Sequence, residues 1–351
     1  MSALPGLILA LLLAFSGQYL SHLIGVTWMG MPKSPISGIM MAILLGILIR
    51  NTIGLHQLFL PGIQFGLKRV LRVGIILLGI RLSLGEVGTI GLQSLPVIIS
   101  AGASALIIVT YLSRRLGLSG RLGTLLAVGT SICGATAIVA TAPTINAKDS
   151  EVSYAVACVT LFGILAMLIY PFAAHWLFNA EEFQVGLFLG TSVHETAQVA
   201  GAGLVYQQFF NSPLALDVAT VTKLVRNLGM LVIIPLMCIV YHRSSFESGA
   251  VPKWWTMVPL FVIGFALMSL VRTVGDMGDS AFGLISKEQW ASIVDFTKES
   301  AELCLAIAMA SVGLGTDIRD LVSIGLKPLV MGLIAALLVG VVSASLILFL
   351  Y

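Results

Sequence analysis

Residues 183–207 read FQVGLFLGTSVHETAQVAGAGLVYQ, a segment that is apolar enough and long enough to enter a membrane. His194 and Glu195 stand side by side near its middle. An ionisable group at bilayer depth costs at least about 2.5 kcal/mol, so it persists where it faces protein or a water-filled cavity, and it usually has a function. The small residues on both sides weaken a helix and let neighbouring backbones approach. The pattern predicts a broken helix that lines a binding site.

A second segment repeats this pattern upstream. Residues 129–134 read GTSICG and align with GTSVHE at 190–195, again inside an apolar run rich in small residues. Two hydrophobic segments interrupted in this way indicate the substrate site of a transporter. The alternative is a pair of helices that pack closely through small residues. The adjacent His194 and Glu195 favour the binding site.

The composition defines the class of protein. The chain has 351 residues, of which 58% are hydrophobic and 10% are charged, whereas soluble domains average about 25% charged residues. The apolar runs are much longer than the roughly 10 residues of a barrel strand. We therefore expect an all-α polytopic membrane protein. The net charge of +3 does not suggest nucleic-acid binding, and the four scattered cysteines suggest neither disulfides nor a metal site.

Eleven hydrophobic segments are predicted to span the membrane, and 121–145 and 183–207 are the broken ones. All five tryptophans lie at or just beyond a predicted end, where membrane proteins carry an aromatic belt. The first segment has no basic residue before it and is longer than the apolar part of a signal peptide. The segments are 4–24, 35–53, 62–82, 95–113, 121–145, 150–174, 183–207, 217–241, 254–272, 298–317 and 327–350.

Lysines and arginines predict the orientation of the chain. With the N-terminus in the cytoplasm, eleven of them fall on the cytoplasmic side and six on the outer side. This predicts a multi-pass protein of the inner (plasma) membrane with its C-terminus outside. The longest polar stretch, 276–299, contains Ser286 and Gln289 in the spacing of a capping box, and we interpret it as a short helix on the membrane surface.

A distant internal repeat predicts inverted topology. The run 78–95 aligns with 312–329 at a constant offset of 234 residues. The two copies lie in the third and tenth segments, and an odd separation gives them opposite orientations. We therefore predict one membrane domain with repeat-like halves at roughly 35–174 and 183–350. The two broken segments are an even number apart, so they are inverted only if one of them is re-entrant.

The breaks predict donors for an anion. A discontinuous helix leaves unpaired N–H groups, with partial positive charge, at the start of its second half. Such a terminus binds anions. The alternative is that the serine and threonine hydroxyls bond back to their own helices. The predicted substrate-binding residues at the breaks are Thr130, Ser131, Cys133, Gly134, Thr191, Ser192 and Gln198.

Three polar residues of the eighth segment share one helix face and complete the predicted substrate site. Lys223, Arg226 and Asn227 are spaced i, i+3 and i+4. Two cations at that depth are expected to meet an anion, which is Glu195, a lipid phosphate or the transported substrate. The alternative places both cations near the membrane surface with extended side chains.

His194 and Glu195 are also candidates for proton coupling, because buried carboxylates and imidazoles can exchange protons near neutral pH. Glu302 in the tenth segment is a further candidate. A stable pair between Glu195 and Lys223 or Arg226 would instead be purely structural.

Enzyme motifs do not fit the chain. The segment beginning at His194 would be a zinc-binding HExxH only if residue 198 were histidine, and it is Gln198. The sequence has no Walker motif and no G-x-S-x-G. We expect no enzyme activity, no catalytic residue, no metal and no cofactor.

These motifs resemble those of a known family. GTSICGATA at 129–137, SVHETAQV at 192–199 and the K-x-x-R of Lys223 and Arg226 are similar to sequences of the sulfate exporter family of prokaryotic membrane proteins, over nearly the whole chain. That family is grouped with cation/proton antiporters and bile-acid symporters. The resemblance implies inverted five-helix repeats, a core domain with discontinuous crossing helices, a panel domain, and export of sulfate or a related sulfur oxyanion. The second break departs from that pattern, because it lies in segment seven.

The sequence therefore predicts a secondary transporter of a small anion that works by alternating access with proton coupling. The alternative is a carrier or antiporter coupled to sodium or protons, with Glu195 as the cation ligand. The lack of a second acid near Glu195 argues against it. A membrane sensor is a third hypothesis, weakened by the lack of a soluble domain. Expected partners are the anion, a coupling proton or sodium ion and the lipid bilayer, and the sequence leaves a homodimer open.

Overall fold

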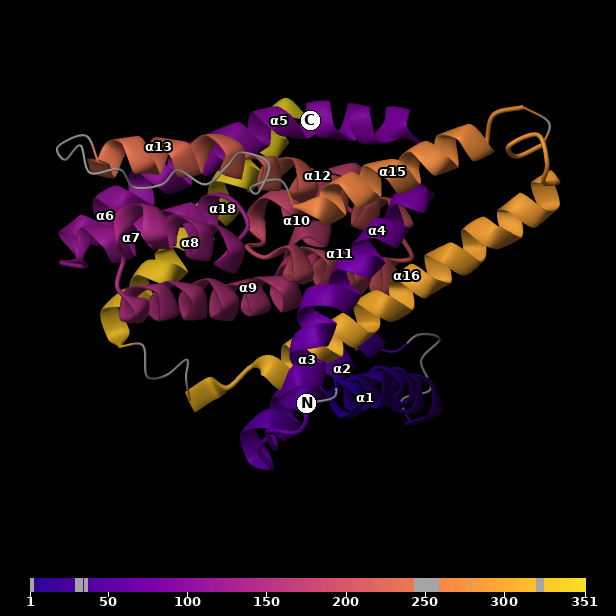
Figure 1. Cartoon of the computed structure of the whole chain (residues 1–351), viewed down its shortest axis with the longest axis horizontal. Coiled ribbons are helices and arrows are strands. Elements are labelled where there is room, and N and C mark those ends of the chain that lie inside the picture. The colour runs from indigo at the N-terminus through magenta and orange to yellow at the C-terminus, as the bar shows by residue number, and fades with distance from the viewer. Residues whose placement is uncertain (1–2, 29–33, 35–36, 243–258, 279, 320–324) are drawn as a thin grey trace. The chain divides into compact units, whose positions relative to one another are not determined.

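The computed structural model describes residues 3–28, 34, 37–242, 259–278, 280–319 and 325–351 (Figure 1). These residues form helices and contain no strand; an isolated bridge joins Ala281 and Ile285. Five of their helices are long and apolar enough to cross a membrane: Leu4–Trp28, Leu84–Arg115, Asp149–Leu177, Pro213–Tyr241 and Leu326–Leu350. The prediction of an all-α polytopic membrane protein is confirmed.

The helices overlap the predicted segments, but the span predicted at 95–113 begins earlier, at Leu84. Trp254, Trp255 and the part of the predicted repeat at 320–324 lie outside the described residues. Short π-helical turns follow α1, α3 and α5, and 3-10 turns follow α4 and α8. The α-helices are α1 Leu4–His22, α2 Gly38–Thr52, α3 Leu60–Phe65, α4 Leu71–Leu78, α5 Leu84–Ser104, α6 Thr110–Arg115, α7 Gly120–Ser131, α8 Ala135–Thr141, α9 Asp149–Leu177, α10 Glu182–Ser192, α11 Thr196–Phe210, α12 Pro213–Leu228, α13 Met230–His242, α15 Leu260–Gly275, α16 Lys287–Gly315 and α18 Leu326–Leu350.

Helix α16 corrects the prediction for residues 276–299. Ser286 caps the helix and forms the predicted capping box with Gln289, whose backbone nitrogen lies 3.3 Å from Ser286 Oγ. The helix then continues without a break to Gly315. The predicted surface helix and the tenth predicted segment are therefore one helix of 29 residues, about 43 Å long at 1.5 Å per residue.

The described chain forms two compact units that alternate along the sequence. The division into units reflects packing and does not test internal repeats. The predicted repeat-like halves at 35–174 and 183–350 therefore stay a prediction. Unit 1 contains Met1–Thr89, Gly203–Asp217 and Leu260–Arg319, and unit 2 contains Ile90–Ala202, Val218–Pro259 and Asp320–Tyr351.

Unit 1 is organised around α16, which packs against α1, α2 and α4. Glycines allow the closest approach of backbones. A Cβ atom on Gly46 of α2 would lie 2.9 Å from the carbonyl carbon of Gly313 in α16. Close packing through small residues is the main source of association between membrane helices, because lipid tails are as apolar as the side chains.

Unit 2 is organised around α9 and α18, which run in the same direction. Near the start of both helices, Cys158 Sγ lies 3.4 Å from the carbonyl oxygen of Pro328. Farther along, the Tyr170 hydroxyl lies 3.4 Å from the carbonyl oxygen of Ala336. Helices α7 and α10 pack against this pair. All four cysteines of the chain are free, as the sequence predicted.

The first broken segment, 121–145, is a helical hairpin. Helix α8 returns alongside α7, so that Gly129 faces the Ile138 side chain, and both helices contribute to one apolar cluster. The entry and exit of the hairpin lie together, because the Ser119 hydroxyl donates to the Glu151 carboxylate at the start of α9. The predicted break is confirmed (Figure 1), but the segment is re-entrant where a crossing helix was expected.

The second break, at residues 193–195, separates α10 from α11. Helix α10 runs back along α9 from the end of that helix, since the rings of Phe188 and Tyr170 lie 5.1 Å apart. It therefore enters from the end of α9 that is opposite to the entry of the first hairpin.

Helix α11 leads the chain back toward the start of α12. Gly203 of α11 packs against Leu216, near the first residue of α12. At the other end of the continuous span Pro213–Tyr241, the Tyr241 hydroxyl donates to the Gly120 carbonyl beside the entry of the first hairpin, at 2.9 Å. The first broken segment is therefore re-entrant, and α10 enters from the opposite end of α9.

Candidate functional site

The turns of the two hairpins meet at α12. Helix α7 ends at Ser131 and α10 ends at Ser192, so the last carbonyl groups of both helices have no partner within their own helix. Lys223 and Arg226 of α12 are buried, with 0% and 3% of their surface exposed. We call residues 130–134 and 191–198, together with Lys223, Arg226 and Asn227, the tip cluster.

Lys223 binds carbonyl groups of both hairpins. Its ammonium nitrogen donates to the carbonyl oxygen of Ile132 at 2.9 Å, to that of Val193 at 3.0 Å, and to that of His194. These three acceptors use all three ammonium hydrogens.

Arg226 also bridges the two hairpins. Its Nε donates to the carbonyl oxygen of Ser131 at 3.0 Å, and its Nη2 donates to that of Thr130. Its Nη1 donates to the carbonyl oxygens of Thr191 at 2.6 Å and Val193 at 3.1 Å. The guanidinium therefore holds the C-terminal ends of α7 and α10 together.

Within the described residues the two cations are held by backbone carbonyl groups, and the expectation that they also meet an anion stays a prediction. Carbonyl groups at a helix C-terminus carry partial negative charge and attract cations. Among the described residues, no ion pair joins Lys223 or Arg226 to Glu195. The sequence could not reveal this arrangement, because backbone acceptors leave no trace in residue identity. A direct role of either cation in substrate binding stays a prediction.

Glu195 lies at the break between α10 and α11. Thr160 of α9 donates its hydroxyl to Glu195 Oε1 at 2.9 Å. The Glu195 side chain covers Gly134, whose φ of +69° and ψ of −128° precede α8. A Cβ atom on Gly134 would lie 2.6 Å from Glu195 Cγ, so glycine is required both by the backbone and by the contact. Glu195 is partly exposed, whereas His194 is 1% exposed.

Gln198 and Asn227 order the start of α11. Gln198 Oε1 accepts from the Glu195 backbone N–H at 3.1 Å, and its amide nitrogen donates to the Thr160 carbonyl oxygen at 3.1 Å. Asn227 Nδ2 donates to the Thr196 hydroxyl oxygen at 3.2 Å. Both predicted residues therefore belong to the tip cluster. Thr160 was not predicted, since one threonine in an apolar segment carries no distinguishing pattern.

The hydroxyl groups at the breaks donate to carbonyl groups of their own helices, which is the alternative that the sequence left open. Thr191 donates to the Leu187 carbonyl at 2.8 Å, Ser192 to the Phe188 carbonyl at 2.5 Å, and Ser131 to the Val128 carbonyl at 3.0 Å. The hydrogen bonds of these hydroxyl groups are therefore made within their own helices.

Two other atoms of the tip cluster are buried without a partner among the described residues: His194 Nδ1 and Asn227 Oδ1. Leaving a buried polar atom unpaired costs about 1–3 kcal/mol. In a native structure such atoms call for an explanation, and a bound polar ligand is one.

The remaining predicted residues lie in different settings. Cys133 packs its sulfur 3.4 Å from the sulfur of Met230. Glu302 belongs to unit 1, where its Oε1 accepts from Arg81 at 3.2 Å and from the Gln207 amide nitrogen at 2.8 Å. Its predicted role in proton coupling is not tested by these contacts.

The fold and the tip cluster define a polytopic membrane protein with two broken helical segments around buried charges. A family described as "Conserved hypothetical protein 698" matches residues 5–332, and the chain belongs to it. A UPF0324 membrane protein of Streptococcus agalactiae is 33% identical over 343 residues, which cover 98% of this chain and 96% of that protein. One from Nitratidesulfovibrio vulgaris is 28% identical over 359 residues, covering 99% and 93%. These names establish a membrane protein family and state neither substrate nor mechanism.

Proposed function

We propose that the protein is a secondary transporter of a small anion that binds at the tip cluster and works by alternating access. The observation that carries the proposal is the charge of the cluster. It contains two buried cations, Lys223 and Arg226, and one carboxylate, Glu195. Two helix C-termini and two helix N-termini meet there, so their partial charges of about −0.5 and +0.5 each cancel. One formal positive charge remains, and it favours an anion.

The unpaired polar atoms supply the contacts for that anion. The His194 tautomer with hydrogen on Nδ1 is a donor. If the Asn227 amide is turned, its oxygen accepts from the Thr196 hydroxyl and its nitrogen becomes free to donate. The same contacts would suit a tetrahedral oxyanion. On the motif resemblance we propose sulfate or a related sulfur oxyanion, exported from the cell, as the substrate.

Glu195 is the proposed coupling group, with His194 as the second candidate. Glu195 lies over the first turn of α8, it is partly exposed, and its only hydrogen-bonding side-chain partner among the described residues is the Thr160 hydroxyl. Protonation would neutralise it and raise the excess positive charge of the cluster. A proton and an anion would then be bound together, because each lowers the electrostatic cost of the other.

A cation-coupled carrier is the second candidate function, since Glu195 Oε1 and the Thr160 hydroxyl are oxygen ligands at one place. Against it, at least six carbonyl oxygens at the breaks already accept from Lys223 or Arg226, and oxygens that accept from a cation are poor ligands for a second one.

We propose that the protein lies in the inner membrane with its N-terminus in the cytoplasm. The first hairpin supports it. Because 121–145 returns to its side of entry, Lys148 joins Arg114, Arg115 and Arg121 on one side, which increases the predicted excess of basic residues in the cytoplasm.

Transport of labelled sulfate and sulfite into proteoliposomes tests the proposal. Asn227→Asp keeps the side-chain shape and adds a negative charge that cancels the excess, so we expect uptake to fall at least about tenfold. Asn146→Asp makes the same change in an exposed turn with φ of 50° and is expected to leave uptake unchanged. Sulfate uptake by Asn227→Asp at the wild-type rate, or no uptake of either anion by the wild type, would contradict the proposal.

A further inference from the structure

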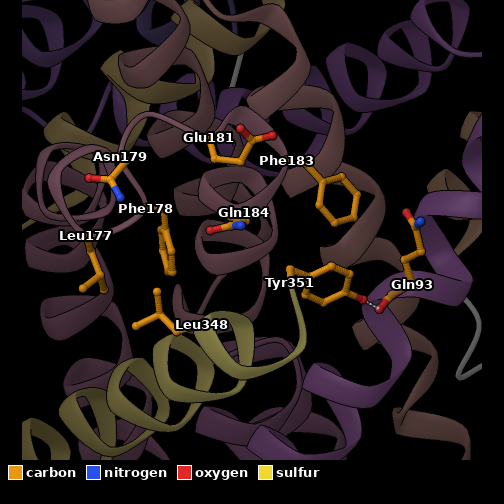
Figure 2. Close-up of a pocket in the computed structure, with 9 residues that line it drawn as sticks. All are labelled: Gln93, Leu177, Phe178, Asn179, Glu181, Phe183, Gln184, Leu348 and Tyr351. Atoms are coloured by element: carbon orange, nitrogen blue, oxygen red, sulfur yellow. Dashed lines mark hydrogen bonds between the residues drawn. The ribbon is translucent and has the colours of Figure 1, made fainter.

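Unit 2 contains a cavity that is not lined by any residue of the tip cluster. It has a volume of about 730 Å³ and lies where α9 ends, α10 begins and α18 ends (Figure 2). Aromatic rings, amide groups and one carboxylate line it: Gln93, Leu177, Phe178, Asn179, Glu181, Phe183, Gln184, Leu348 and Tyr351. We call it the rim cavity.

Two aromatic rings form one wall of the rim cavity. The rings of Phe183 and Tyr351 have centroids 5.5 Å apart and are inclined by 55°, so they present an angled pair of faces (Figure 2). The Tyr351 hydroxyl donates to the Gln93 carbonyl oxygen, which fixes the ring. Burial raises the pKa of the Tyr351 phenol, so the hydroxyl remains a neutral donor at physiological pH. Phe178, which also lines the cavity, is buried, and its ring lies 5.6 Å from that of Phe188.

Glu181 is the one charged residue that lines the cavity. It is the N-cap residue of α10, and its side chain makes no hydrogen bond to the helix. Among the described residues, no lysine or arginine forms an ion pair with it. Its carboxylate is therefore exposed and available at the mouth of an aromatic cavity, a setting that disfavours anions.

The neighbouring surface indicates the depth of the cavity in a membrane. Trp176 is 83% exposed and Phe349 is 85% exposed, and both lie within a few residues of the lining. Exposed tryptophan and other aromatic residues mark the level of the lipid headgroups.

We propose that the rim cavity binds an ammonium group, held by the Glu181 carboxylate and by the faces of Phe183 and Tyr351. A positive charge over aromatic rings gains about 0.5–2 kcal/mol, depending on its exposure to water, and aromatic walls with a carboxylate suit quaternary and primary ammonium groups. The amides of Gln93, Asn179 and Gln184 suit the polar atoms of the same molecule. The ammonium group belongs either to a lipid headgroup or to a free solute.

Choline and its neutral isostere 3,3-dimethyl-1-butanol test the charge requirement. We expect choline to raise the melting temperature of the purified protein in a saturable manner, and the isostere to have no effect at equal concentration. Glu181→Gln and Tyr351→Leu should each weaken choline binding at least about fivefold. Glu182→Gln alters the adjacent carboxylate, which does not line the cavity, and should bind choline as the wild type does.

Native mass spectrometry separates the two sources of the ammonium group. Retention of phosphatidylethanolamine over phosphatidylglycerol, lost in Glu181→Gln and kept in Glu182→Gln, would identify a lipid headgroup. Binding of choline or ethanolamine without lipid preference would identify a free solute. The proposal is wrong if neither source binds, if the neutral isostere binds as well as choline, or if Glu181→Gln binds both like the wild type.

Discussion

Each compact unit buries an arginine, and the two are neutralised in different ways. In unit 1, Arg81 Nε lies 2.6 Å from Asp217 Oδ1, and Arg81 Nη1 lies 3.2 Å from Glu302 Oε1. In unit 2, Arg226 donates to backbone carbonyls of two helix ends and meets no carboxylate among the described residues. An ion pair cancels formal charge, whereas carbonyl dipoles satisfy hydrogen bonds and leave the charge in place. The first arrangement is suited to structure and the second to attracting an ion.

The largest effect is expected from removing Arg226. Arg226→Ala leaves the carbonyl groups of Thr130, Ser131 and Thr191 without their donor, at about 1–3 kcal/mol each. We expect a destabilisation of at least about 4 kcal/mol, seen as loss of monodisperse protein in detergent. Arg114→Ala removes an exposed arginine and should change stability by less than about 0.5 kcal/mol. Equal melting temperatures for the two variants would show that the carbonyl contacts are not structural.

Breaking the ion pair of unit 1 should affect stability and spare anion binding. The side chains of Arg81 and Asp217 are 7% and 11% exposed. Removing one member of a buried pair costs about 3–5 kcal/mol, and Glu302 remains as a partner, so we expect about 3 kcal/mol for Asp217→Asn. Thermal unfolding and sulfate uptake are to be measured on the same preparations. Loss of uptake in a variant that is folded would remove the distinction between the two arginines.

A smaller effect is expected at the turn of the first hairpin. Gly134→Ala places a Cβ atom 2.6 Å from Glu195 Cγ at a positive φ, so it should destabilise the protein by about 2 kcal/mol and displace Glu195. Gly88→Ala is the control, because a Cβ atom there meets nothing within 4 Å, and alanine favours a helix by about 0.5–1 kcal/mol. A normal melting temperature and normal pH dependence of uptake for Gly134→Ala would show that Glu195 does not need this contact.

The smallest effect belongs to an exposed ion pair of unit 1. Burial opposes ionisation of Asp276, but hydrogen bonds from Trp290 and Arg272 outweigh it and lower the pKa of this carboxyl. The resulting stability is present above the ordinary Asp pKa of about 3.9 and is lost as pH falls through the lowered value in the folded protein. Because the side chain is 44% exposed, the contribution should be below about 1 kcal/mol. Asp276→Asn should flatten the melting temperature below pH 4; an unchanged acid profile would contradict this.

Periodicity and composition predicted the helices and both breaks, because small residues around His194 and at 129–134 interrupt apolar runs visibly. The direction in which the chain continues after the first break was not predictable. The return of α8 along α7 depends on the positive φ of Gly134 and on the contact between Ser119 and Glu151, which are far apart in sequence. The charged residues were found by their depth in apolar segments. Their partners were not, because Lys223 and Arg226 bind backbone oxygens, which every residue carries.

In the proposed mechanism the tip cluster binds an anion and Glu195 couples its binding to protons. The most direct measurement is the melting temperature of the purified protein against sulfate and sulfite from pH 5 to 8. At a hundredfold excess over the dissociation constant, a ligand stabilises the folded state by about 2.7 kcal/mol. We predict anion stabilisation that depends on pH in the wild type, does not depend on pH in Glu195→Gln, and is absent in Asn227→Asp. Stabilisation by sodium alone, abolished in Glu195→Gln, would contradict the account and identify a cation site.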